Sequence, residues 1–273
     1  MYIKKINGEE EEFDGNKLLE SLERAGVSEN ARKEILAHIQ AEISDGMSTK
    51  EIYTHAYSLI RKKEKKAAAK YSLRRAVMDL GPAGFPFEQL IADIYKQKGY
   101  TVVTDNYVKG HCVEHEMDVI AHKGSELIMI EAKFHNQEGV KSDLKVALYV
   151  KARFDDLYAG TFDYGEAKKL TKGILVTNTK FTHTAIAYAK CSGLNLIGWN
   201  YPHEYNLQHM IEESVLHPIT SLNNLSKKDK TLLLQKNIVL LRDLQNNQSV
   251  LAEIGLSREK QKNVMNELKT IIN

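Results

Sequence analysis

Two carboxylates and a lysine in the middle of the chain stand out by their types and spacing. Glu131 and Lys133 lie two apart at the end of an apolar run, and Asp118 lies among apolar neighbours upstream. Residues two apart on a strand point to the same side, and an adjacent antiparallel strand could bring Asp118 beside them. Two carboxylates at one point repel each other and suit Mg²⁺ (or Mn²⁺), which also takes phosphate oxygens. The group therefore indicates metal-dependent phosphodiester hydrolysis, with Lys133 orienting or deprotonating the attacking water.

The elements that must position these residues can be predicted from the surrounding pattern. The spacing of apolar residues predicts an amphipathic helix over 87–98, ended by Gly99. Four strands are predicted, at residues 101–103, 117–121, 127–133 and 173–178. The third is apolar on both faces until Glu131, so we expect it to be central. Helical patterns between and after the strands predict an α/β domain with a mixed sheet.

The order of these features resembles a known family. Asp118, twelve intervening residues and then Glu131-Ala132-Lys133 resemble the PD-(D/E)xK nuclease motif. The flanks resemble Mrr-type restriction endonucleases, over roughly residues 84–200, in the segments 87–88, 99–102, 176–182, 185–190 and 193–197. The resemblance implies that Asp118 and Glu131 bind metal, that Lys133 is catalytic and that Glu88 is an auxiliary acid. The Mrr-type enzymes often have glutamine at the position of Glu131, where glutamate is commoner in the wider superfamily. Without the flanks, a Glu-x-Lys sequence is more often a solvated ion pair.

The histidines of this region support weaker interpretations. His111, Cys112 and His115 have the types and spacing of zinc ligands, but no second cluster of the usual spacing follows them. His115 and Glu116 could instead lie at the rim of the metal site. His135 follows Lys133 by two, so it either touches a phosphate or a water, or is a surface histidine beyond the strand end.

The N-terminal residues 1–17 predict a β-hairpin that leads into a helix. Asn7-Gly8 is a strong turn signal, and Asp14 can cap the helix. Residues 49–80 contain neither glycine nor proline and have helical periodicity, which predicts one long helix. The chain has no GxxxxGK[ST], so no phosphate-cradling P-loop is expected.

The same segment resembles the ATP-cone, a regulatory nucleotide-binding module. The resemblance covers residues 2–80 and lies in Lys-x-Asn-Gly, in Glu-Phe-Asp-x-x-Lys-Leu and in residues 69–76. It implies binding of ATP or dATP, with nucleotide contacts at Lys5, Glu11, Asp14, Lys17, Thr49 and Tyr53. The family usually has a basic residue at the position of Ile6, where Lys4 could substitute. The alternative is that Lys4, Lys5 and Lys17 are solvated charges on a small helical cap.

Proline and charge divide the chain into three predicted domains. Gly81 to Pro86 and His217-Pro218 predict boundaries that give residues 1–81, 82–218 and 219–273. Their formal charges are +1, −3 and +4, which sum to the chain's +2. The last domain has helical periodicity, with Ser257 a cap of its final helix. It resembles helix-hairpin-helix DNA-binding modules, and a protein-contact or dimerisation bundle is the alternative.

These features predict a multidomain α/β protein that is a Mg²⁺-dependent DNA endonuclease regulated by ATP or dATP. The alternative is a nucleotide-responsive DNA-binding or regulatory protein whose nuclease fold is catalytically silent. Two cysteines in 273 residues exclude a disulfide scaffold, and no apolar run approaches the roughly 20 residues of a membrane span. We expect a cytoplasmic protein. Double-strand cleavage by a single-site nuclease would also require a homodimer.

Overall fold

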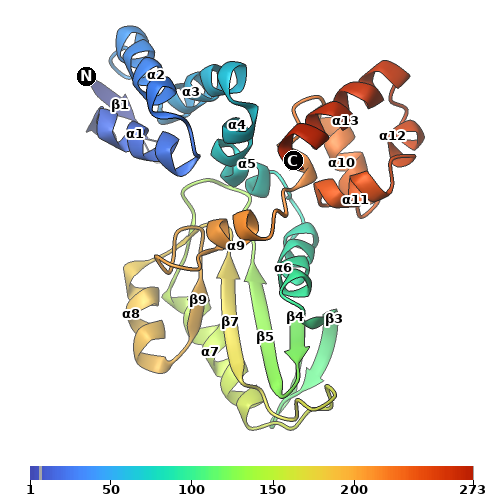
Figure 1. The fold of residues 1–273 in the computed structure, drawn as a ribbon. Helices are drawn as coiled ribbons and strands as arrows, with labels where there is room; N and C mark the ends of the chain where they lie inside the picture. The colour runs from blue at the N-terminus through green and yellow to red at the C-terminus, as the bar shows by residue number, and fades with distance from the viewer. Residues whose placement is uncertain (6–7, 273) are drawn as a thin grey trace.

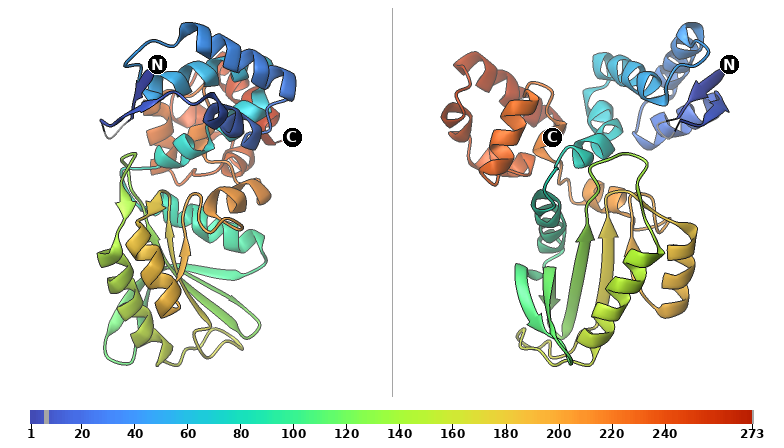
Figure 2. Two further views of the ribbon diagram at one scale, coloured as in Figure 1. Left: turned by 90° about the vertical axis from the view of Figure 1, so that its left-hand side faces the viewer. Right: turned by 180° about the vertical axis from the view of Figure 1, so that it is seen from behind.

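The computed structural model describes residues 1–5 and 8–272, which form an α/β sheet domain and two helical domains (Figure 1). Both helical domains lie at the end of the sheet toward which strands β5 and β7 point (Figures 1 and 2). The expected multidomain α/β fold, with helical domains at both ends of the chain and a mixed central sheet, is confirmed. No helix within the described residues combines the length and the hydrophobicity that a membrane crossing requires.

The N-terminal domain begins with the expected hairpin. Strands β1 (Tyr2–Lys4) and β2 (Glu10–Glu12) pair antiparallel, while Asn7 of the expected turn lies outside the described residues. The Asp14 carboxylate accepts a hydrogen bond from the backbone N–H of Asn16, at the start of α1 (Gly15–Arg24), as a helix cap should. Helices α2 (Glu29–Glu42) and α3 (Thr49–Lys63) complete this part. The buried faces of the three helices form one core.

The prediction of one helix over residues 49–80 was wrong, because the chain breaks twice. After α3 come α4 (Lys65–Tyr71) and α5 (Leu73–Met78). At the first break Glu64 leaves the helical region, with φ −140° and ψ 83°. Its carboxylate accepts hydrogen bonds from the backbone N–H and the hydroxyl of Ser28, at 3.2 and 2.5 Å. These long-range bonds favour the break, and a local pattern cannot show them.

The central domain is built on a five-stranded sheet of order β3-β4-β5-β7-β9. The strands are β3 (Thr101–Lys109), β4 (Glu114–Lys123), β5 (Glu126–Lys133), β7 (Lys172–Thr177) and β9 (Asn195–Ile197). The first three pair antiparallel, and β5, β7 and β9 pair parallel, so the sheet is mixed. The expectation that β5 is central is confirmed, because four of its residues in succession, 127–130, are buried.

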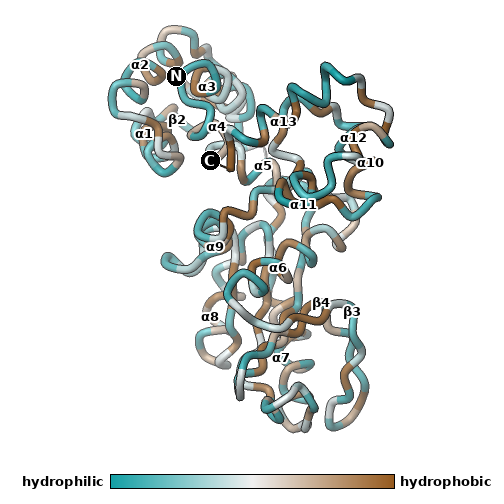
Figure 3. The backbone as a smooth tube through the Cα atoms, turned by 45° about the vertical axis from the view of Figure 1, so that its right-hand side comes forward, coloured by the Kyte–Doolittle hydropathy of each residue, from teal (hydrophilic) through white to brown (hydrophobic). Residues whose placement is uncertain are grey.

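Helices cover both faces of this sheet. Helix α6 (Phe85–Gln97) packs on one face, and α7 (Leu144–Tyr158) and α8 (His183–Ser192) pack on the other. Figure 3 shows β4 as a hydrophobic stretch, as expected for a strand covered on both faces. A short parallel pair, β6 (Lys141–Ser142) and β8 (Lys180–Phe181), lies outside the main sheet. Helix α9 (Leu207–Glu213) follows β9.

The C-terminal domain is helical, as expected. A 3-10 turn (Ile219–Ser221) leads to α10 (Lys227–Gln235), α11 (Leu241–Asn246), α12 (Val250–Glu253) and α13 (Arg258–Ile272). The hydroxyl of Ser257 accepts a hydrogen bond from the backbone N–H of Lys260, so Ser257 caps α13 as predicted. This domain packs against the N-terminal one, where Ala69 of α4 joins its core and the Tyr57 hydroxyl donates to Asn223.

A buried histidine precedes the C-terminal domain and should make the fold acid-sensitive. His217 is 6% exposed, and its Nδ1 has no hydrogen-bond partner among the described residues. Burial, with Lys70 and Lys66 nearby, lowers its pKa from 6.5 to about 4. Below pH 6.5 the histidine is protonated in the unfolded chain, whereas in the folded chain it stays neutral down to about pH 4. The free energy of unfolding therefore falls as the pH drops from 6.5 toward 4.

We expect the free energy of unfolding to be about 2 kcal/mol lower at pH 5 than at pH 7 because of His217. Urea denaturation of His217→Gln at the two pH values should show a shallower pH dependence than the wild type. His203→Gln, which changes an exposed histidine, is the matched control. Equal pH dependence in all three proteins would contradict the assignment.

Candidate functional site

The strand register places Asp118 beside Glu131. The paired register of β4 and β5 ends at Val119 with Ile130, and one further step along both strands brings Asp118 opposite Glu131. The Asp118 Oδ2 accepts a hydrogen bond from the backbone N–H of Ala132 at 2.6 Å. Lys133, two residues beyond Glu131 on β5, is exposed. The structure therefore brings together the two carboxylates that the sequence singled out, with the lysine next along the same strand.

Glu88 reaches the same site from the first turn of α6. Its side chain folds against Gly84, where a Cβ would lie 2.9 Å from Glu88 Oε1, so a larger residue there would displace the carboxylate. Burial raises the pKa of Glu88 to about 7, and the charges of Asp118, Asp105 and Glu131 add to the shift. Glu88 is thus within electrostatic range of both strand carboxylates.

Two further acidic residues belong to this group. Asp105 on β3 lies opposite Asp118, since its neighbours Thr104 and Asn106 pair with Val119 and Met117. Asp105 has a positive φ of 49°. Apart from glycine, asparagine and aspartate are the residues that adopt this left-handed conformation most readily. Glu116 lies two residues before Asp118, and the charges of Asp105 and Glu116 add to the rise that burial causes in the pKa of Asp118. Sequence reasoning placed Glu116 at the rim but missed Asp105, because its position depends on the pairing of β3 with β4.

Burial and mutual repulsion raise the pKa values of Glu88, Asp118 and Glu131 in the protein alone. Burial, followed by the charge of Asp118, raises the pKa of Glu131 to about 7, against lowering contributions from Arg153 and Lys133. Burial also raises the pKa of Asp118. A set of oxygen ligands that repel one another when ionised fits a hard divalent cation such as Mg²⁺, which would compensate the charge. Asp118 and Glu131 are the residues that could hold it.

Arg153 of α7 is a site residue that sequence reasoning missed. Its guanidinium Nη1 forms an ion pair with the Glu131 carboxylate and also donates to the backbone carbonyl of Glu116 at 3.0 Å. Its Nη2 donates to the Tyr149 hydroxyl at 2.8 Å, and the ring of Tyr149 lies under the guanidinium. The sequence shows that Tyr149 and Arg153 are one helical turn apart, but it does not show that this face of the helix lies against Glu131.

The histidines near the site have other partners. The Asp156 carboxylate accepts from the backbone N–H of Cys112 at 2.6 Å and lies 2.8 Å from His115 Nε2. Asp156 therefore anchors the turn before β4 and the start of β4, and the zinc interpretation has no support in these contacts. His135 lies 2.9 Å from Ser142 Oγ, and its backbone N–H donates to Asn178. It thus links the end of β5 to β6 and to the segment after β7.

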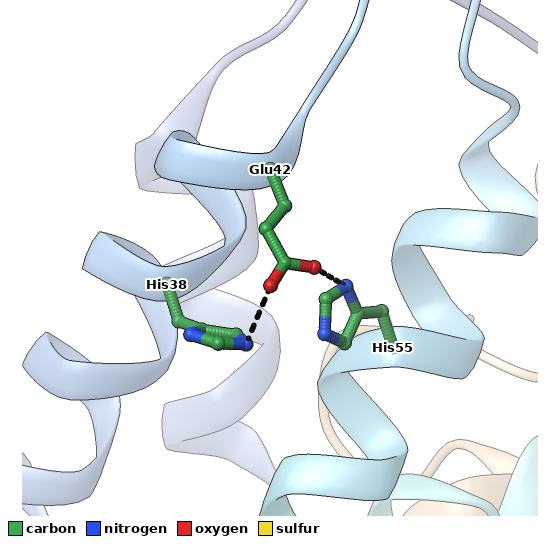
Figure 4. Close-up of side chains that lie close together, drawn as sticks. All are labelled: His38, Glu42 and His55. Carbon is green, nitrogen blue, oxygen red and sulfur yellow. Dashed lines mark ion pairs between the residues drawn. The ribbon is translucent and has the colours of Figure 1, made fainter.

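A different set of potential metal ligands lies in the N-terminal domain (Figure 4). Glu42 of α2 contacts His38 Nε2 at 3.1 Å and His55 Nδ1 of α3 at 3.3 Å, and the two imidazole rings lie edge to face. Sequence reasoning missed this cluster, although the four-residue spacing of His38 and Glu42 on one helix was visible. On these contacts the cluster links α2 to α3.

Four of the six expected nucleotide contacts line one cleft. Lys5, Glu11, Thr49 and Tyr53 lie on a cleft of about 1000 Å³, and Asp14 and Lys17 are not among the residues that line it. Lys17 nevertheless contacts Glu11 at 3.2 Å, and Glu11 contacts Lys5 at 3.0 Å. The Tyr53 ring stacks on Tyr71 at 5.0 Å between centroids, and its hydroxyl is buried without a partner among the described residues.

Most of the chain matches known protein families. Residues 1–79 match the ATP cone domain, residues 83–200 match the restriction endonuclease (Mrr catalytic) family, and residues 217–272 match the AF1548-like C-terminal domain. An uncharacterized protein from Archaeoglobus fulgidus is 37% identical over 183 residues, which are 67% of this chain and 99% of that protein. The crystal structure of the protein of unknown function AF1548 is 36% identical, with a TM-score of 0.56, and the match covers 70% of this chain and 98% of that one.

The chain belongs to the AF1548-like family. It carries a Mrr-type restriction endonuclease domain and an ATP cone, and about a third of it has no counterpart in the A. fulgidus relative. MspJI restriction endonuclease in complex with an oligonucleotide is 14% identical over 56% of this chain and 37% of that one, and its TM-score of 0.32 is too low to support an inference. For the C-terminal domain, the AF1548-like match leaves both DNA binding and protein contact as predictions.

Proposed function

We propose that this AF1548-like protein is a Mg²⁺-dependent DNA endonuclease whose activity is regulated by ATP or dATP. The observation that carries the proposal is the group formed by Asp118, Glu131 and Lys133 at the end of the central strands of a Mrr-type domain. The fusion of this domain to an ATP cone supports the regulatory half. The two exposed free cysteines accord with a reducing cytoplasm, where we place the protein.

The residues of the site divide the work of hydrolysis in this proposal. Asp118 and Glu131 would hold Mg²⁺ (or Mn²⁺), which polarises a phosphodiester and lowers the pKa of water. Lys133 is exposed beside them and can orient the attacking water or offset the negative charge of the transition state. Glu88, with its raised pKa, can hold a proton near neutral pH and so serve as the auxiliary acid.

The regulatory half of the proposal predicts nucleotide binding that depends on the hairpin and on α3. Lys5→Ala should weaken ATP or dATP binding about tenfold, because it removes a charge-assisted contact from the cleft. Isothermal titration calorimetry measures this, and Lys33→Ala, which removes an exposed lysine of α2 that does not line the cleft, is the control for loss of a lysine. Equal affinities in all three proteins would remove Lys5 from the site.

DNA and a second copy of the chain are the proposed partners. A site with one Lys133 cuts one strand, so cleavage of both strands would need two copies. The C-terminal domain carries the chain's largest positive charge, which supports a role in contacting the DNA backbone. Because the middle domain has a formal charge of −3, we expect DNA binding to be modest and salt-sensitive.

One observation favours a second candidate, a nucleotide-responsive DNA-binding regulator without catalysis. Arg153 forms an ion pair with Glu131 and so neutralises a carboxylate that a metal ion would need. While the guanidinium stays there, Glu131 is not free to bind Mg²⁺. DNA binding that changes with nucleotide, without metal-dependent cleavage, would favour this candidate.

A further inference from the structure

The cleft that contains the expected nucleotide contacts has a second wall. Besides Lys5, Thr49 and Tyr53, it is lined by residues 136 and 138–141 of the segment after β5, and by Lys180 of β8. Figure 1 shows the segment after β5 rising from the sheet toward the N-terminal helices. Arg74 and Arg75 of α5 lie on the cleft as well. The cleft is therefore formed by the ATP cone and the nuclease domain together.

The cleft carries three cations, Arg74 from the ATP cone and Lys141 and Lys180 from the nuclease domain, that form no ion pair among the described residues. Lys141 and Lys180 are direct partners in the β6–β8 pair, where like charges repel. Desolvation lowers the pKa of Lys180, and the nearby charges of Arg74 and Lys141 add to the shift. Among residues 1–5 and 8–272, no carboxylate lies within 4.0 Å of any of these three cations. The Nε of Arg74 is also buried and has no hydrogen-bond partner among the described residues.

Unpaired cations facing a large cleft are the arrangement that binds a polyphosphate. We propose that Arg74, Lys141 and Lys180 bind the phosphates of a nucleoside triphosphate whose nucleoside contacts the ATP cone, so that the nuclease domain completes the nucleotide site. This inference rests on the proposed function, because it takes the nucleotide to be the ligand of the cleft. A volume of about 1000 Å³ is at the upper end of small-molecule sites and is ample for a nucleoside triphosphate.

The same wall is physically connected to the candidate catalytic lysine. Asn178 accepts a hydrogen bond from the backbone N–H of His135 and returns one to its carbonyl, each at 2.8 Å. The Asn178 amide also contacts the sulfur of Met78, at 3.1 Å, and Met78 lines the cleft. His135 is two residues after Lys133. A phosphate that draws α5, β6 and β8 together would therefore act on the backbone that positions Lys133.

A close packing contact reinforces this connection. Phe134, which follows Lys133 directly, lies so near Gly81 that a Cβ on Gly81 would stand 2.5 Å from the ring. Gly81 ends the segment that leads out of α5. The residue after the candidate catalytic lysine is thus packed against the exit of the ATP cone, which leaves little room for the two to move independently.

The composite site is tested by comparing ATP with AMP, since AMP lacks the outer phosphates. Isothermal titration calorimetry of the full chain should give tighter binding of ATP than of AMP. The double variant Lys141→Ala/Lys180→Ala should weaken ATP binding about 10- to 100-fold and AMP binding much less. Lys145→Ala, which removes an exposed lysine of α7 that does not line the cleft, should bind both as the wild type does.

The outcomes separate this inference from the proposed function. Absence of ATP, dATP and AMP binding to the wild type would overturn the nucleotide-sensing half of the proposed function. ATP binding that is equal in the wild type and the double variant would overturn only the composite site. The conservative variant Lys180→Arg, which keeps the charge, should retain ATP affinity within a few-fold. Loss of affinity in Lys180→Arg equal to that in Lys180→Ala would also contradict phosphate binding by charge.

Discussion

Lys133→Ala is expected to reduce the rate of Mg²⁺-dependent DNA cleavage by a factor of about 10³ or more. Loss of one group that stabilises developing charge costs about 10²–10³, and loss of help in proton transfer adds to it. Because Lys133 is exposed at the end of β5, its removal leaves no cavity and no unpaired buried group. The thermal midpoint and DNA affinity should therefore change little.

A plasmid nicking assay under single-turnover conditions measures this loss directly. Lys109→Ala is the matched control, because Lys109 is an exposed lysine at the end of β3 in the same sheet. The control should cleave as the wild type does. Full activity in Lys133→Ala would remove the lysine from the mechanism, and a fall in both variants would point to a general loss of DNA binding.

Asp118→Asn is expected to abolish cleavage and, at the same time, to stabilise the metal-free protein. The asparagine oxygen can still accept the hydrogen bond from the Ala132 N–H, so the geometry is retained. The substitution removes a partly buried negative charge beside Glu131, whose pKa that charge, after burial itself, helps to raise to about 7. We expect the free energy of unfolding at pH 8, without metal, to rise by about 1–2 kcal/mol.

The pH dependence of this gain follows from the direction of the pKa shifts. Glu131 and Glu88 titrate near pH 7 in the folded protein, so they are charged at pH 8 and largely protonated at pH 5. Their repulsion with Asp118 is thus present at pH 8 and fades as the pH falls. Urea denaturation should show that the advantage of Asp118→Asn shrinks at pH 5.

Adding Mg²⁺ should reverse the order of the two proteins at pH 8. A ligand that binds only the folded state stabilises it, so the wild type should gain stability and Asp118→Asn should gain much less. Leu148→Asn, a neutral change on the exposed face of α7, controls for the introduced amide. A wild type that is already more stable than Asp118→Asn without metal would contradict the electrostatic account of the site.

Sequence reasoning reached the fold and part of the site for an identifiable reason. The strand with Glu131 and Lys133 was predictable because it is buried on both faces and so is continuously apolar. The proximity of Asp118 needed only one antiparallel neighbour, and the register supplies it. The end of the helix at Glu64 was not predictable, because its cause is a hydrogen bond to Ser28, 36 residues away.

Asp105 and Arg153 were missed for the same physical reason. Asp105 faces Asp118 only because β3 pairs with β4 in one register. Arg153 meets Glu131 only because α7 crosses that face of the sheet. The Lys141 and Lys180 pair depends likewise on the contact of β6 with β8, two strands of two residues each. Local patterns carry periodicity, whereas these neighbours are set by tertiary packing.

The most direct test of the proposed function is cleavage of closed circular DNA by the full chain, with Mg²⁺ or with EDTA, and with or without ATP or dATP. The proposal predicts nicking or linearisation that requires Mg²⁺, changes in rate with one of the nucleotides, and is lost in Lys133→Ala. An intact plasmid under every condition, or cleavage that persists in EDTA, would contradict it.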